Sequence, residues 1–152
     1  MIDKKEAINR LKKICSKKEK CLSEIKNKLK EWQINDEDAS EIIEILLQEN
    51  YINEERYVNA FVNDKIKFDK WGKKKIVHEL RMKGINETLI NKAINDIDEE
   101  EYYKILKNLI EKKKKLIGDS SFETRQKLIR FLISKGYDFD DIKKFIDIEN
   151  FD

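Results

Sequence analysis

Residues 74–94, KKIVHELRMKGINETLINKAI, predict two short helices joined by a tight turn. Ile76 and Leu80 have the i, i+4 spacing of one helix face. Gly84 follows, and glycine adopts without steric penalty the left-handed conformation that often ends a helix. The side chain of Asn86 can then cap the start of the second helix. The stretch therefore predicts a helix, a glycine turn and a second helix.

The same pattern occurs twice more in the chain, at offsets of 51 and 52 residues and without a gap. The apolar positions that align across the three copies include Ile25, Ile76 and Leu128, followed by Leu29, Leu80 and Leu132. A repeat of this length indicates tandem supersecondary units. The turn position holds Gly84 and Gly136 in two copies but Gln33 in the first. Because glutamine lacks the conformational freedom of glycine, the first turn is expected to be built differently, with help from Asn35 or Asp36.

A further amphipathic helix is predicted before each pair, at residues 3–17, 54–69 and 99–116. Asp98 and Ser120 are each followed three residues later by glutamate, which is the spacing of a capping box at a helix start. The result is an all-α protein of about nine helices, in three tandem three-helix units over residues 1–50, 51–97 and 98–152. A unit of ~50 residues buries little surface alone. We therefore expect the units to pack as an elongated, curved repeat arrangement.

Composition excludes several other classes of protein. The 152 residues contain no proline and only four dispersed glycines, so the turns of a β-sandwich and the glycine cluster of a phosphate loop are both missing. No apolar run approaches the ~18 residues of a membrane span, and residues 1–13 lack the apolar core of a secretory signal. We therefore expect a cytoplasmic protein with no membrane contact.

The sequence contains few residues of the types that catalyse reactions or bind metals. Cys15 and Cys21 are the only cysteines and His78 is the only histidine, which is too small a set for a zinc site. There is no nucleophile elbow, no paired His and Cys and no phosphate loop, and the carboxylates alternate with lysines as they do on solvated helix faces. We therefore expect no catalytic residues, no metal and no cofactor.

The contents of the repeat resemble the RecX family, which regulates the RecA recombinase. Residues 51–62, YINEERYVNAFV, are similar to the family segment "gYLDD-x-RFA-x-x-FV", and residues 72–85 to "G-x-x-KI-x-x-EL-x-x-KGI". Residues 24–29 are similar to "EL-x-x-KL" and residues 130–137 to "RFL-x-x-RGF". The resemblance covers almost the whole chain in the same order. Cys21 departs from it, because a capping serine is expected there, so this cap is weakened or moves to Ser23.

The resemblance implies a specific role in DNA repair, recombination and the SOS response. Family membership would mean that the chain binds the RecA filament on single-stranded DNA, lying in the helical groove and bridging protomers. It would inhibit ATP hydrolysis, strand exchange and filament growth. The family has no known catalytic centre, and we expect a monomer.

Local positive charge predicts where a partner binds, although the net charge is only +2. The candidates are Lys73, Lys74, Lys75, Arg81 and Lys83, the run Lys112, Lys113, Lys114 and Lys115, and the weaker pair Arg130 and Lys135. They could meet acidic recombinase surface or, weakly and without sequence preference, DNA phosphate. The alternative is that these residues bind no partner and only form solvated helix faces. The lysines at 112–115 would then interact favourably with the negative end of the helix dipole.

The two tryptophans have different expected roles. Trp71 lies in a polar loop, where it can anchor an interface or fold back as a lid over the helix that contains Phe61. Trp32 ends a helix and is expected to pack between units.

Two other functions remain open at this point. The first is a direct, non-specific DNA-binding helical protein, because helix–turn–helix pairs also occur in transcription factors. The low net charge argues against it. The second is a helical-repeat scaffold for another protein partner, which the repeat alone would favour.

Overall fold

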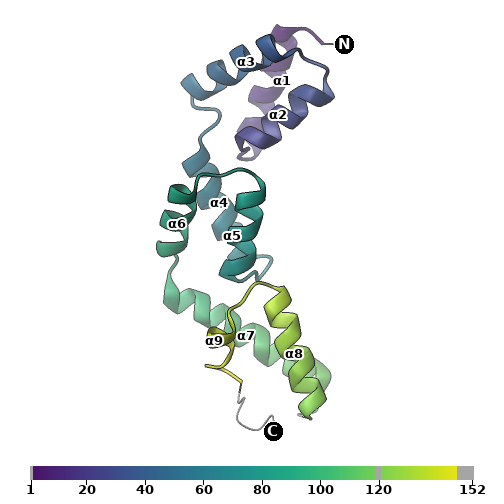
Figure 1. The fold of residues 1–152 in the computed structure, drawn as a ribbon, viewed down its shortest axis with the longest axis vertical. Coiled ribbons are helices and arrows are strands. Elements are labelled where there is room, and N and C mark those ends of the chain that lie inside the picture. Colours follow the sequence, from purple (N-terminus) through teal and green to yellow (C-terminus); the bar gives the residue numbers. More distant parts are fainter. Residues whose placement is uncertain (1, 119–120, 147–152) are drawn as a thin grey trace.

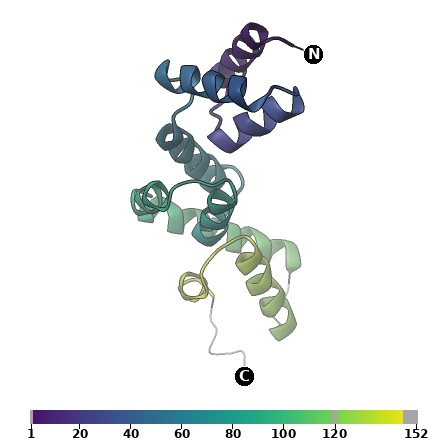
Figure 2. The ribbon, with the colours of Figure 1, turned by 45° about the horizontal axis from the view of Figure 1, so that its top comes forward.

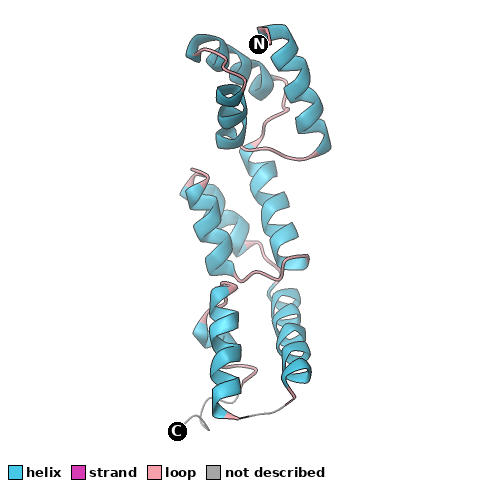
Figure 3. Ribbon diagram, turned by 90° about the vertical axis from the view of Figure 1, so that its right-hand side faces the viewer, coloured by secondary structure: helices cyan, strands magenta, loops and turns pink. Residues whose placement is uncertain are grey.

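The computed structural model describes residues 2–118 and 121–146. Over these residues the chain forms nine helices and no strand. Figure 3, coloured by secondary structure, shows helices joined by loops. The first unit contains α1 (Lys4–Lys17), α2 (Leu22–Glu31) and α3 (Asp36–Gln48). The second contains α4 (Glu54–Lys67), α5 (Lys73–Met82) and α6 (Glu87–Asn95). The third contains α7 (Glu99–Ile117), α8 (Phe122–Ser134) and the short α9 (Phe139–Ile142).

The three units follow one another along a single long axis. Figure 1 shows α1–α3 at one end, α4–α6 in the middle and α7–α9 at the other end. The view in Figure 2 shows that the path is bent rather than straight. The predicted all-α, elongated and curved arrangement of three-helix units is therefore confirmed.

The three turns between paired helices have the same hydrogen-bond pattern. Gly84 and Gly136 have φ values of +75° and +101°, and Gln33 has the left-handed value of +58°. In each turn the next residue donates its N–H to the carbonyl five positions earlier, as Ile34 does to Leu29 and Ile85 to Leu80. The prediction that the first turn is built differently was wrong, because glutamine adopts the glycine conformation there. Asn35 contributes separately, as the cap of α3.

Most helix starts are capped as the sequence indicates. Asn86 accepts from the N–H of Thr88, and Asp98 accepts from the N–H of Glu101. The cap of α8 is Ser121, which accepts from the N–H of Thr124, so the prediction of a helix start after Ser120 was one residue early, and Ser120 itself lies outside the described residues.

Cys21 is the N-cap of α2, so the cap does not move to Ser23. Its backbone N–H donates to the carboxylate of Glu24 at 3.1 Å.

The buried apolar side chains form two separate clusters. The first unit has its own core, in which Ala7, Leu11, Ile42 and Leu46 are fully buried. Trp32 packs against this core, under Arg10 and Lys28, so the prediction that it packs between units was wrong. The second and third units share the other cluster, which runs without interruption from α4 to the end of the described chain. Among the described residues of the first unit, Cys21 alone is buried in this shared core.

The contact between the second and third units, the second joint, is made by backbone. The N–H of Gly72 donates to the carbonyl of Lys135 at 2.7 Å, and the N–H of Lys74 donates to the carbonyl of Gly136 at 3.0 Å. A Cβ atom at Gly72 would lie 2.2 Å from the carbonyl carbon of Gly136. The hydroxyl of Tyr137 adds a bond to the carbonyl of Lys70 at 2.9 Å. The two units are therefore held in one fixed relative position.

The contact between the first and second units, the first joint, is made by side chains. Arg56 forms an ion pair with Glu19 in the α1–α2 loop. The N–H of Leu22 donates to Glu54 at 3.4 Å. Apart from the bonds that end α3, from the N–H groups of Tyr51 and Ile52 to the carbonyl of Leu46, no backbone–backbone hydrogen bond between described residues crosses this joint.

Candidate partner-binding surface

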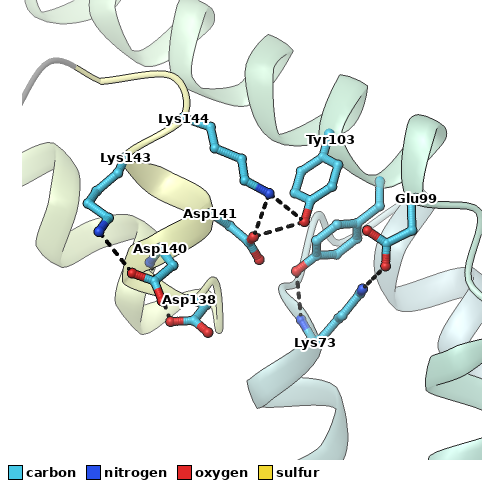
Figure 4. Close-up of polar contacts among 9 residues, drawn as sticks. Lys73, Glu99, Tyr103, Asp138, Asp140, Asp141, Lys143 and Lys144 are labelled. Carbon is cyan, nitrogen blue, oxygen red and sulfur yellow. Dashed lines mark hydrogen bonds and ion pairs between the residues drawn. The ribbon is translucent and has the colours of Figure 1, made fainter.

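Two of the predicted cations are already paired across the second joint. The ammonium group of Lys73 lies 2.8 Å from the carboxylate of Glu99 and above the ring of Tyr102, as the close-up in Figure 4 shows for the ion pair. Lys74 lies 3.6 Å from Asp138. These lysines bind the third unit, and their charge is balanced within the chain.

Two further predicted cations of the second unit are also paired. Arg81 forms an ion pair with Glu87 at the start of α6. Lys83 lies 3.6 Å from Glu24 and so reaches across the first joint. The hydrogen bond from Arg81 lowers the pKa of Glu87, and the positive charge of the guanidinium adds to the effect.

Further lysines near the end of the described chain are similarly engaged. Figure 4 shows the ammonium group of Lys144 between the hydroxyl of Tyr103 and the carboxylate of Asp141. Lys143 pairs with Asp140 at 3.0 Å.

Trp71 lies on the body of the protein and does not project from it. Its ring packs edge-on against Phe61, with centroids 6.2 Å apart. The ammonium groups of Lys65 and Lys75 lie 4.6 and 4.5 Å from the centre of the same ring. Of the two alternatives for Trp71, this geometry is that of a lid over the Phe61 helix. A role as an interface anchor stays a prediction.

Three lysines that are far apart in the sequence come together beside the second joint. Lys75 is on α5, Lys113 is on α7 and Lys135 caps α8. Burial lowers the pKa of Lys135, and the positive charges of Lys75 and Lys113 lower it further. Among the described residues, none of the three has an ion-pair partner.

The other members of the predicted set lie elsewhere. Lys112, Lys114 and Lys115 are exposed on α7, and Arg130 is exposed on α8. The last turn of α7 holds Lys114 and Lys115, where they face the negative end of the helix dipole. The structure thus separates the predicted basic residues into paired, clustered and solvated groups.

Sequence reasoning missed three residues next to this group of lysines. Lys65 pairs with Asp69 at 2.8 Å, and its hydrogen bond lowers the pKa of Asp69, to which the positive charges of Lys65, Lys135 and Lys75 add. Phe68 ends α4 and is 77% exposed. The signal for these residues was available, because residues 65–71 interleave lysine with two aromatic residues. The lysine run at residues 73–75 that follows dominates the local charge pattern.

The first joint places two carboxylates close together. Burial raises the pKa of Glu54, and the negative charge of Glu24 adds to the effect. One of its oxygens is buried without a hydrogen-bond partner. Burial also acts to raise the pKa of Glu24, but hydrogen bonds from Cys21 and the charges of Lys83 and Lys20 outweigh it, so the pKa is lowered.

The cavities of the described chain are shallow and of mixed character. A groove of 480 Å³ lies between the α1–α2 loop and α4, and its lining includes Glu19, Tyr57, Phe61 and Phe68. The described residues contain no group of three or more His, Cys, Asp or Glu side chains placed to hold a metal ion. Within the same residues, every helix is too short or too polar to cross a membrane.

Comparison with known proteins gives matches along most of the chain. The family model described as "RecX, second three-helix domain" matches residues 53–94, and the one described as "RecX, third three-helix domain" matches residues 99–146. Together they match more than half of the 152 residues.

The similar sequences carry the same family name. A "Regulatory protein RecX" from Clostridium perfringens (strain 13 / Type A) is 32% identical over 120 residues, which is 77% of this chain and 56% of that protein. The chain thus spans somewhat more than half the length of this clostridial relative. Another "Regulatory protein RecX", from Actinobacillus pleuropneumoniae serotype 5b (strain L20), is 27% identical over 94% of this chain and 92% of that protein.

Two solved structures have the same fold. The crystal structure of a regulatory protein RecX superposes with a TM-score of 0.82 and 25% identity, over 93% of this chain and 72% of that one. A RecX from Lactobacillus salivarius gives a TM-score of 0.79 at 23% identity, over 97% and 96% of the two chains.

Proposed function

The chain belongs to the RecX family, and from this premise we propose that it regulates the RecA recombinase. Its partner would be the filament that RecA forms on single-stranded DNA. The observation that carries the proposal is the match of two family models over residues 53–94 and 99–146. The matched part contains the second joint, which fixes the relative position of the six helices α4–α9.

The shape of the molecule supports a filament partner. A helix of ~15 residues is ~22 Å long, so three units in a row could reach across several protomers of a protein filament. A long molecule with many modest contacts can obstruct a filament without a catalytic site. We propose that the consequence is inhibition of ATP hydrolysis, strand exchange and filament growth. The chain would act as a monomer in the cytoplasm, where the recombinase works.

The test is the DNA-dependent ATPase activity of RecA, preassembled on single-stranded DNA, with this protein titrated in. We expect the rate to fall at ratios well below one molecule per RecA protomer, because one molecule that blocks growth affects many protomers. Light scattering from the same samples should report shorter filaments. An unchanged rate at saturating protein and low salt, with RecA from the same source, would contradict the proposal.

A matched variant connects this activity to the surface described above. Replacing Lys75 and Lys135 by alanine removes two charges beside the second joint, and replacing Lys114 and Lys115 removes two charges from the solvated end of α7. If the surface near the second joint meets the filament, the first variant should require more protein for half-inhibition than the second. Equal inhibition by both variants would assign the contact to another face.

A further inference from the structure

One carboxylate oxygen at the first joint is buried without a hydrogen-bond partner. It is Oε2 of Glu54, in the first turn of α4. The other oxygen of the same carboxylate accepts a bond from the N–H of Leu22 at the long distance of 3.4 Å. Buried polar atoms are nearly always paired, and an unpaired one is costly, most of all when it carries charge. Ionised Glu54 is therefore an unfavourable contact in the arrangement that the structure describes.

A second carboxylate lies beside it. Glu24 accepts a bond from the N–H of Cys21 at 3.1 Å, and Glu54 accepts one from the N–H of Leu22, the next residue along the chain. Two acids that bind adjacent N–H groups are close neighbours, and each disfavours the charge of the other. Burial is the larger cause of the raised pKa of Glu54, and the negative charge of Glu24 adds to it.

The charged groups around this pair do not reverse the effect. Burial opposes the charge of Glu24, but hydrogen bonds from Cys21 and the charges of two lysines lower its pKa, so Glu24 stays ionised where Glu54 titrates. Lys26 attracts the charge of Glu54, but less strongly than burial disfavours it. The other titratable or charged groups at the joint are Cys15 of α1, Glu19 and Lys20 of the α1–α2 loop, Arg56 and Tyr57 of α4, and Lys83 at the end of α5.

Little else holds the first joint. The first unit has an apolar core of its own, and of its described residues only Cys21 is buried in the core of the other two units. The backbone bonds from Tyr51 and Ile52 to Leu46 end α3 and do not tie the α1–α2 loop to α4. The first unit can therefore separate from α4 and keep its own core intact.

We infer that the first joint is an acid-closed hinge, in which protonated Glu54 keeps the α1–α2 loop docked on α4 and ionised Glu54 favours its release. Release would bring the carboxylate of Glu54 into water and would expose Cys21. The angle between the first unit and the other two would then depend on the pH around the protein. The inference goes beyond the regulation of RecA, since it concerns the chain alone.

The direction of the pH dependence follows from linkage. Because docking raises the pKa of Glu54 through burial and the charge of Glu24, the docked joint binds the proton more tightly than the released one. The added stability of the docked joint is fully present below the ordinary value of 4.5 and is lost as the pH rises through the docked-state pKa. A single proton changes the docking equilibrium by at most about tenfold per pH unit.

The two native cysteines serve as reporters for the test. Cys21 is fully buried at the joint, whereas Cys15 lies in the core of the first unit. N-ethylmaleimide labels each thiol when it becomes exposed, and trypsin cleaves at the lysines between them, so mass spectrometry follows each cysteine on its own peptide. The rate for a small model thiol at the same pH, divided by the measured rate, gives the protection of each cysteine.

The protection of Cys21 should rise as the pH falls from 7 to 4.5, by at most about tenfold per unit, and that of Cys15 should change less. Glu54→Gln cannot ionise but keeps an oxygen for the N–H of Leu22, so its protection of Cys21 should already be high at pH 7 and should not rise. Glu55→Gln is the matched control. It lies in the same turn, loses only a surface ion pair with Lys92 and should keep the profile of the parent protein.

Three results would overturn the hinge. The first is a pH profile of Cys21 that is flat in the parent protein or unchanged in Glu54→Gln. The second is an equal profile for Cys15 and Cys21, which would mean that the first unit unfolds as a whole. The third is a flattened profile in Glu55→Gln as well, which would assign the effect to the charge of the helix start. The assay contains no recombinase, so its outcome is separate from that of the ATPase test.

Discussion

Gly72 and Gly136 lie backbone against backbone, 64 positions apart in the sequence. A side chain at either glycine would clash with the backbone of the segment that contains the other. A Cβ at Gly136 would lie 2.5 Å from the Cβ of Lys75 and 2.8 Å from the carbonyl oxygen of Gly72. Gly72 has an ordinary φ of −83°, so it is required for space and not for conformation. Gly136 is required for both, since its φ is +101°.

Gly136→Asn should therefore lower the free energy of unfolding by about 2–3 kcal/mol, near the upper end of the range for overpacking. The matched control is Gly84→Asn. Gly84 also has a left-handed φ, which asparagine tolerates, but no atom lies within 4 Å of the point that a Cβ would occupy there. Its substitution should cost about 0.5 kcal/mol or less. Urea unfolding measures both, and equal losses would mean that the close approach at the second joint contributes nothing.

Gln33→Gly should raise the free energy of unfolding by about 0.5–1 kcal/mol. Glutamine pays about 1–2 kcal/mol for its left-handed conformation, and glycine avoids this cost but loses some entropy on folding. Gln33→Ala is the control, because alanine meets the same steric conflict and should leave stability near that of the parent protein. A stabilising Gln33→Ala would show that the side chain of Gln33, and not its backbone, sets the effect.

Tyr102→Phe should destabilise the protein by about 1–2 kcal/mol. Gly72 provides no side-chain cap for α5, and the N–H of Lys73 donates instead to the buried hydroxyl of Tyr102 at 3.0 Å. Removing that hydroxyl leaves the partly buried N–H of Lys73 without this acceptor. Tyr103→Phe is the comparison, since the hydroxyl of Tyr103 bonds to Asp141 and Lys144 nearer the surface. Thermal or urea unfolding should show the smaller loss for Tyr103→Phe, and the reverse order would contradict the capping role.

Glu54→Gln should stabilise the protein at pH 7, and the gain should shrink as the pH falls. The folded protein raises the pKa of Glu54 through burial and the charge of Glu24, so the folded state binds a proton more tightly than the unfolded state does. A group with a raised folded pKa adds stability at low pH and loses it as pH rises through that pKa. Glutamine is neutral throughout and therefore removes the dependence.

Glu55→Gln controls for the position of Glu54 in the first turn of α4, where either carboxylate favours the helix dipole. Glu55 is paired with Lys92 on the surface at 2.8 Å, so its replacement should give no gain at pH 7. Unfolding measured from pH 7 to pH 4 for both variants tests the idea. A gain for both, or a gain for Glu54→Gln that grows on acidification, would contradict it.

The repeat of apolar positions was sufficient to predict the helices and their order. Ile25, Ile76 and Leu128 align in the sequence, and all three are buried in the structure. The pattern works because each copy places its core residues by local helical spacing alone. The turn at Gln33 could not be predicted in this way, since the residue adopts an unfavourable conformation that only the packing of α2 against α3 enforces.

The basic surface was harder to predict than the fold. The run from Lys73 to Lys75 is continuous in the sequence, yet Lys73 and Lys74 turn to acids of the third unit and only Lys75 is left without a carboxylate. Whether a lysine is free depends on acids that are distant in the sequence. The fold brings Lys135 beside Lys75 through a contact between two glycines, and no local pattern reports such a contact.

The two joints differ in stiffness, and this has a mechanical consequence. The second joint is closed by backbone bonds at 2.7 and 3.0 Å with no room for a side chain, while the first is closed by side chains such as Arg56 and Glu54. The second and third units are thus expected to move as one rigid body, to which the first unit is attached at one end. If a bound partner changes the curvature of the molecule, the change in orientation between units would occur at the first joint. The first unit would then rotate relative to the other two, which would keep their relative position.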